Sequence, residues 1–256
     1  MSYFIYQGEK IYYEEHGSGE PLILLHGNTV SSKFFTPVLP MFAKKYRVIA
    51  LDFLGCGQSG KKSEWSADLW YEWSRQVVAL CDELSLSRVK LIGCSGGALV
   101  AINVALEEPE LVDCIVADSF EGLIADSEIT EQIRIGRNFA KQNAEFCSML
   151  TAFHGKDWEK VLDSDTETVI AHAKTIGSFF HKPIEELKVK TLLTGSQEDE
   201  MFSKGHYETL YADICGRTRN AKCHIFEHGG HPAMMSNIKE FVLLCEKFFD
   251  ETCGME

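Results

Sequence analysis

The chain has 256 residues, of which 45% are hydrophobic and 25% are charged, and its formal net charge is −13. This length suits one α/β domain with a sizeable core, and the composition excludes disordered, collagen-like and coiled-coil classes. The acidic balance argues against a nucleic-acid partner or an anionic membrane surface.

The cysteines and the first residues of the chain bear on its location. The nine cysteines lack C-x-x-C pairs and metal-ligand spacing, and Cys94, Cys114 and Cys245 lie in apolar segments. Cysteines used as small hydrophobic residues are typical of a reducing compartment. Residues 1–7 show no basic segment or sustained apolar run, and no stretch of the chain reaches the length of a membrane span. We therefore expect a cytoplasmic protein without a metal site.

The first part of the chain alternates between short apolar runs and amphipathic segments. Residues 3–15 form two aromatic and β-branched runs around Gly8, which predicts a hairpin at one edge of a sheet. Four buried strands are predicted at 22–25, 46–51, 89–93 and 112–117. Apolar residues at helical spacing separate them, so the pattern predicts a largely parallel sheet with helices on both faces.

This rhythm changes after the sixth predicted strand. Between residues 120 and 184 we find two apolar faces at helical spacing and no strand-like run. One face is Ile129, Ile133, Gly136, Ala140, Ala144 and Cys147, and the other is Val169, Ala173, Ile176 and Phe180. The segment is also rich in aromatic residues. We therefore expect a helical insertion that forms a lid over a pocket.

The sheet pattern resumes after this insertion. Strands are predicted at 189–194 and 223–226, and a closing helix has apolar residues at helical spacing between Ile238 and Phe249. No repeat or linker indicates a second independent domain.

One motif indicates chemistry. Gly93-Cys94-Ser95-Gly96-Gly97 stands between a predicted strand and a predicted helix, which is the context that G-x-S-x-G requires. A sharp turn there would lift Ser95 clear of the sheet, and the glycines would let neighbouring backbone pass closely. The N–H of Gly96, at the start of the helix, would point to where an oxyanion forms.

A serine nucleophile needs a base, and the base needs an orienting acid. Both should follow strands, because an open α/β sheet builds its site at the carboxyl ends of its strands. The loop after Leu193 offers Asp199, and the loop after Phe226 offers His231. The resulting order is Ser, Asp, His.

Four motifs in this order resemble those of the α/β-hydrolase superfamily, and the resemblance covers nearly the whole chain. They are His26-Gly27-Asn28, the run Asp52 to Ser59, the Ser95 motif, and Gly229-Gly230-His231-Pro232. The resemblance implies a doubly wound α/β-hydrolase core of residues 1–119 and 185–256, with residues 120–184 as a helical cap. It also implies that the backbone N–H groups of Asn28 and Gly96 form the oxyanion hole.

The acid has two alternatives. The family often places its acid three residues after the glycine that ends this strand, where this chain has Glu198. Asp199 lies one residue further on, as if the loop carried one insertion, and we favour it. Asp118, at the end of the preceding strand, is the other alternative, because some family members take their acid from there.

Three features imitate functional motifs. The segment Gly55 to Gly60 satisfies G-x-G-x-x-G, but a nucleotide-binding loop must run straight into a helix, and a polar stretch follows here. His228 could be mistaken for the base, and we expect a loop or strand-end histidine. Cys94 is expected to pack in the core.

These residues predict a serine hydrolase of the carboxylesterase kind that acts on a small-molecule acyl substrate without a cofactor. The same triad also permits acyl transfer, lactone opening, C–C bond hydrolysis and perhydrolysis. A serine nucleophile argues against dehalogenases and epoxide hydrolases, which use aspartate in this superfamily, and the H-G-G-P-G loop of proline iminopeptidases is absent. A ligand-sensing module is the alternative of another class, but it has no need of a complete triad.

Overall fold

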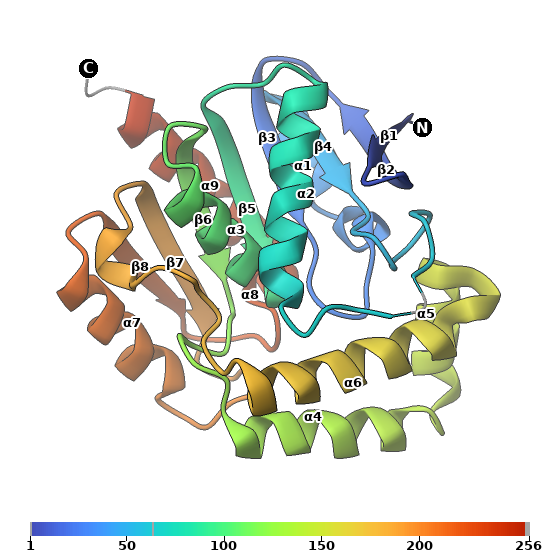
Figure 1. Ribbon diagram of the computed structural model, residues 1–256. Coiled ribbons are helices and arrows are strands. Elements are labelled where there is room, and N and C mark those ends of the chain that lie inside the picture. The colour runs from blue at the N-terminus through green and yellow to red at the C-terminus, as the bar shows by residue number, and fades with distance from the viewer. Residues whose placement is uncertain (1, 63, 254–256) are drawn as a thin grey trace.

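A sheet of eight strands runs through the molecule, and helices cover both of its faces (Figure 1). The computed structural model describes residues 2–62 and 64–253. The strands are β1 (Ser2–Tyr6), β2 (Glu9–His16), β3 (Glu20–Leu25), β4 (Tyr46–Leu51), β5 (Val89–Cys94), β6 (Val112–Asp118), β7 (Lys190–Ser196) and β8 (Ala221–Phe226). Their order in the sheet is β1-β2-β4-β3-β5-β6-β7-β8.

The sheet is parallel except at one edge. The hairpin of β1 and β2 pairs antiparallel, and β2 also runs antiparallel to β4. All other neighbouring strands are parallel. The predicted doubly wound α/β sheet with an edge hairpin is therefore confirmed.

Helices pack on the two faces because consecutive strand residues point in opposite directions. In β3, Ile23 and Leu25 join one apolar core and Leu22 and Leu24 the other, so the strand is buried on both faces from Leu22 to Leu25. The first face is covered by α2 (Leu69–Glu83), α3 (Gly96–Glu107) and α7 (His206–Arg217). The second is covered by η1 (Ser32–Phe35), α1 (Leu39–Phe42), α8 (Ala233–Ser236) and α9 (Ile238–Cys253).

A helical insertion separates β6 from β7, and in Figure 1 it lies beneath the sheet. It comprises α4 (Ser127–Ala140), α5 (Ala144–His154), η2 (Gly155–Asp157) and α6 (Trp158–Thr175), and η3 (Ile184–Glu186) follows it. Its two ends meet, since Ala125 donates to Gly177 O (2.7 Å) and Phe179 donates to Leu123 O (3.0 Å). The domain boundaries at residues 119 and 185 stay a prediction.

The insertion differs from its sequence pattern in detail. The first predicted apolar face is divided between two helices, because Asn143 accepts hydrogen bonds from the N–H groups of Glu145 and Phe146 and so starts α5. On the second face, α6 ends at Thr175, and Phe180 is buried in the following loop. The helix α7 was not predicted. Within the described residues, no helix has both the length and the apolar character needed to cross a membrane.

The strand order creates a crevice at one place. β3 lies between β4 and β5, so the chain leaves β3 and β5 on opposite sides of the sheet. Ligands of open α/β sheets bind at the carboxyl ends of strands where the order reverses in this way. Leu25 pairs with Gly93, which brings the loop after β3 beside Ser95.

Candidate active site

Ser95 occupies a strained turn between β5 and α3. Its backbone angles are φ 54° and ψ −125°, a conformation that non-glycine residues rarely adopt. A Cβ on Gly93 would lie 2.0 Å from Gly97 O, and a Cβ on Gly97 would lie 2.0 Å from Leu25 O. The turn therefore requires glycine on both sides of the serine.

The loop after β3 packs directly on this turn. A Cβ on Gly27 would lie 3.0 Å from the Ser95 Cβ and 3.6 Å from the Gly96 nitrogen. Across residues 2–62 and 64–253, the backbone N–H groups of Asn28 and Gly96 donate to no protein acceptor. Two amide donors without partners thus stand next to the serine, as an oxyanion hole requires.

His26 fixes the position of this loop. Its Nδ1–H donates to Gly27 O (2.8 Å), and its Nε2 accepts from the N–H of Phe53 (3.1 Å) at the end of β4. Burial lowers the pKa of His26 to about 4, so the imidazole is neutral near pH 7. A neutral ring can both donate and accept, and both of these bonds therefore form.

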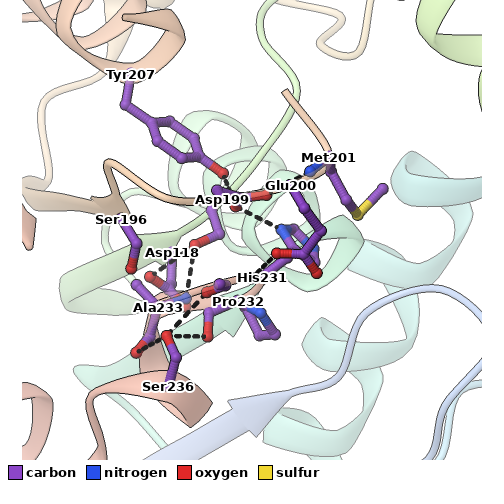
Figure 2. Close-up of polar contacts among 12 residues, drawn as sticks. Asp118, Ser196, Asp199, Glu200, Met201, Tyr207, His231, Pro232, Ala233 and Ser236 are labelled. Atoms are coloured by element: carbon purple, nitrogen blue, oxygen red, sulfur yellow. Dashed lines mark hydrogen bonds and ion pairs between the residues drawn. The ribbon is translucent and has the colours of Figure 1, made fainter. Parts of the chain in front are cut away.

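His231 and Asp199 form a hydrogen-bonded pair, shown in Figure 2. The distance from His231 Nδ1 to Asp199 Oδ2 is 2.8 Å. A carboxylate accepts the Nδ1 proton, so Nε2 carries the lone pair of the neutral ring. His231 Nε2 is buried and has no hydrogen-bond partner among the described residues. The imidazole is thus oriented with one basic nitrogen available.

The Asp199 carboxylate accepts two further hydrogen bonds. Tyr207 OH donates to Oδ2 (2.6 Å), and the N–H of Met201 donates to Oδ1 (2.9 Å). Burial alone would raise the pKa of Asp199, but the hydrogen bond and charge of His231, with the Tyr207 and Met201 bonds, outweigh it and lower the pKa. Asp199 therefore stays ionised at neutral pH.

The two alternative acids bind elsewhere. Glu198 accepts from the N–H of Gly229 (3.2 Å) and so holds the backbone of the His231 loop. Asp118 is buried and accepts from Thr194 Oγ1 (2.7 Å) and the N–H of Met234 (2.9 Å). Burial raises the pKa of Asp118 to about 6 despite these bonds. Of the three candidates, Asp199 is the one whose carboxylate meets the imidazole.

A cavity of about 60 Å³ opens at Ser95 between the sheet and the insertion. Its apolar wall comes from α3, α4, α6 and the loop before α7, and Glu121 and Arg137 add polar groups. The apolar lining residues are Leu99, Ile129, Ile133, Val169, Met201 and Phe202. A groove of about 310 Å³ shares four of the cavity's lining residues and extends along α4 to Phe146. The serine therefore faces a mostly apolar space with room for a small molecule.

The family follows from two comparisons. A family model described as alpha/beta hydrolase fold matches residues 20–145. The solved structure of a serine hydrolase involved in carbazole degradation superposes with a TM-score of 0.77 over 97% of this chain and 98% of its own, at 24% identity. The chain belongs to the α/β-hydrolase superfamily.

The proteins similar to this chain in sequence include hydrolases of different kinds. A 2-hydroxy-6-oxo-6-(2'-aminophenyl)hexa-2,4-dienoic acid hydrolase from Metapseudomonas resinovorans is 28% identical over 91% of this chain and 85% of its own length. A proline iminopeptidase from Lactobacillus helveticus is 25% identical over 96% of each chain. These relatives indicate that this chain is a hydrolase. They do not agree on one substrate, so the substrate of this chain is inferred from its site.

Several site residues of this α/β hydrolase are not predicted from the sequence. Tyr207 supports Asp199 from α7, where Tyr207, Tyr211 and Ile214 recur at helical spacing and could have predicted the helix. Arg137 lines the cavity, and Asp165 hydrogen-bonds to Asn28. No local pattern marks Arg137 or Asp165, since their partners are distant in the sequence.

The three features that resemble functional motifs, namely the Gly55 to Gly60 segment, His228 and Cys94, do not line the Ser95 cavity. In the part of the chain that the structure describes, the next helix after the Gly55 to Gly60 segment is α2, which begins only at Leu69, so no described helix starts directly at the glycines. His228 is 80% exposed and faces Glu198 at 3.7 Å. Cys94 is buried with its Sγ 3.9 Å from Leu25 O, and burial raises the pKa of its thiol.

Proposed function

We propose that this α/β hydrolase is a serine hydrolase that cleaves the carboxylic ester of a small, mostly apolar acyl group. The observation that carries the proposal is the His231 ring, tied to Asp199 through Nδ1 and left with a buried, unpartnered Nε2. A neutral imidazole nitrogen with no hydrogen-bond partner is free to accept a proton, so it can act as a general base. Ser95, on its strained turn, is the nucleophile that this base would serve.

The proposed reaction passes through an acyl-enzyme. Ser95 Oγ attacks the ester carbonyl while His231 Nε2 takes the hydroxyl proton, and Asp199 stabilises the imidazolium. The N–H groups of Asn28 and Gly96 bind the oxyanion of the tetrahedral intermediate. His231 then protonates the leaving alkoxide. A water molecule, deprotonated by the same nitrogen, hydrolyses the acyl-enzyme and releases the acid.

The cavity supports a small acyl group. Its walls are mostly apolar, and the groove along α4 gives a longer acyl chain somewhere to lie. Because the insertion covers the serine, it would also exclude water from the charged intermediate. This chemistry needs no metal or organic cofactor.

C–C bond hydrolysis is a second candidate, which the similarity to the dienoic acid hydrolase favours. The two activities are separated by one substrate panel. It contains p-nitrophenyl esters of graded acyl length, a γ-lactone, and the 2-hydroxy-6-oxo-dienoic acid of that relative. Ester turnover with no cleavage of the dienoic acid supports our proposal, whereas preferred cleavage of the dienoic acid replaces it with the second candidate.

The nucleophile is tested with a fluorophosphonate probe, which reacts with activated serines. We expect labelling at Ser95, identified by mass spectrometry of the digested protein. Ser95→Ala should lose the label and lower kcat by about 10⁴- to 10⁶-fold, because triad residues act as a unit. Equal labelling or turnover by Ser95→Ala would show that another residue is the nucleophile.

A further inference from the structure

The side chain of Asn28 is held at both ends. Its Nδ2 donates to Asp165 Oδ2 on α6 (2.7 Å), and its Oδ1 accepts from Trp70 Nε1 on α2 (3.1 Å). The two partners also fix which end of the carboxamide is oxygen, since the indole only donates and the carboxylate accepts. The loop after β3 is thereby tied to α2 and to the helical insertion.

This carboxamide rests on the turn that carries the serine. A Cβ on Gly96 would lie 2.0 Å from Asn28 Oδ1 and 2.7 Å from Trp70 Nε1. The Asn28 side chain therefore contacts the α-carbon of the residue that follows Ser95. The side chain of one residue with a free N–H group is thus packed against the α-carbon of the other.

Asp165 is itself rigidly placed. It is fully buried, and its second oxygen, Oδ1, accepts from Arg137 Nη1 on α4 (2.7 Å). Arg137 Nη1 also donates to Thr166 Oγ1 (3.0 Å). A buried carboxylate is costly unless it is paired and hydrogen-bonded, so this ion pair fixes the carboxylate between α4 and α6.

A second contact from the insertion reaches the next residue of the loop. The Nε2–H of His154, at the end of α5, donates to Thr29 O (2.9 Å), and its Nδ1 accepts from the N–H of Gly57 (3.0 Å). Thr29 has a φ of 63°, in the left-handed region that non-glycine residues seldom adopt. The insertion thus holds two consecutive residues, Asn28 and Thr29, of which one has a strained backbone.

We infer that the helical insertion sets the geometry of the oxyanion hole, and that Asp165 is a positioning residue acting through the Asn28 side chain. The inference rests on the proposed function, because it takes the N–H groups of Asn28 and Gly96 as the oxyanion donors. The insertion then does more than cover the cavity. It orients a donor that matters more for the tetrahedral intermediate than for the bound ester.

The test is Asp165→Asn, with Asp163→Asn as the matched control. Asp163 lies on the same helix, is 51% exposed and pairs with Lys141 on the surface. For a p-nitrophenyl ester, we expect Asp165→Asn to lower kcat about 10- to 100-fold while KM changes less than about threefold, since a misplaced donor weakens the transition state. Asp163→Asn should keep the parent values. A parent kcat in folded Asp165→Asn would overturn the inference.

Asn28→Ala provides a second route, because it cuts the link and leaves the ion pair of Arg137 and Asp165 in place. Asn28→Ala should lower kcat about as much as Asp165→Asn does. The kcat of the double variant, Asn28→Ala with Asp165→Asn, should be no lower than that of the less active single variant. If Asp165→Asn does not fold, Asn28→Ala alone decides: a parent kcat there overturns the inference.

A structural role without positioning would instead reduce the free energy of unfolding and leave kcat per folded molecule unchanged. The inference and the proposed function fail separately. If Ser95→Ala stays active, the proposed function is wrong. If Ser95→Ala is inactive but the Asp165 and Asn28 variants keep the parent kcat, only the inference is wrong.

Discussion

The three carboxylates around His231 have two different tasks. Asp199 binds the imidazole, while Glu198 and Glu200 accept from the backbone N–H groups of Gly229 and His231 and so hold the loop. Figure 2 shows Asp199 between Tyr207 and His231. Glu198 and Glu200 flank Asp199 in the loop, but of the three side chains only that of Asp199 points inward to the imidazole. The Asp199 side chain is 2% exposed.

Asp199→Asn tests this division. An amide can accept from His231 only through its oxygen and can also present an N–H, which favours the imidazole tautomer with the proton on Nε2. We expect kcat for an ester to fall by about 10⁴-fold, the size of the effect of the corresponding change in serine proteases. The measurement is steady-state turnover of the folded variant.

Glu198→Gln is the control for Asp199→Asn. Gln keeps an oxygen that can accept from the N–H of Gly229, so kcat should stay within about threefold of the parent. An active Asp199→Asn together with an inactive, folded Asp118→Asn would instead assign the acid to the strand β6.

At the scale of helices and strands, the sequence predicted those features that residues close together in the chain determine. The apolar runs fixed the strands, and the glycines around Ser95 predicted the turn because a Cβ would clash there. The contact between Asn28 and Asp165 spans 137 residues and two elements, so no spacing reveals it. Asp165 lies on the buried face of α6, where a sequence pattern favours an apolar residue, and its partner Arg137 comes from another helix.

The helices of the insertion place their aromatic residues in different surroundings. Phe146, at the start of α5, lines the groove that continues from the Ser95 cavity, whereas Phe139 near the end of α4 is 74% exposed. Phe179 and Phe180 are buried in the loop that returns to the sheet. Phe146 is therefore the aromatic side chain placed to limit the length of an acyl group.

Phe146→Ala should lengthen the groove without unfolding the protein. We expect kcat/KM for a longer acyl ester to rise about 10-fold relative to a short one, the scale on which apolar pockets discriminate between chain lengths. Phe139→Ala, with its side chain in solvent, should keep the parent ratio. An unchanged ratio in Phe146→Ala would mean that the acyl chain lies elsewhere.

Across the whole molecule, titratable groups with shifted pKa values have opposite effects on the free energy of unfolding as the pH falls. Burial lowers the pKa values of His26, His154 and His172, so the unfolded chain binds protons before the folded one. Burial raises the pKa of Asp118 to about 6 and that of Glu121 to about 7, so these carboxyls take up protons first in the folded state. Acid therefore destabilises the fold through its histidines and stabilises it through these two carboxyls.

His26→Gln isolates one of these effects. The pKa of His26 is about 4 in the folded protein, where burial outweighs the charges of Asp52 and Asp165, against 6.5 in the unfolded chain. Between these values the unfolded state binds more protons, so the free energy of unfolding contributed by His26 is complete above about pH 6.5 and falls as the pH is lowered. We expect the difference in free energy of unfolding between parent and His26→Gln to shrink by about 2 kcal/mol from pH 7.5 to pH 5. Urea unfolding at both pH values measures it, and a constant difference would show that His26 titrates alike in the folded and unfolded states.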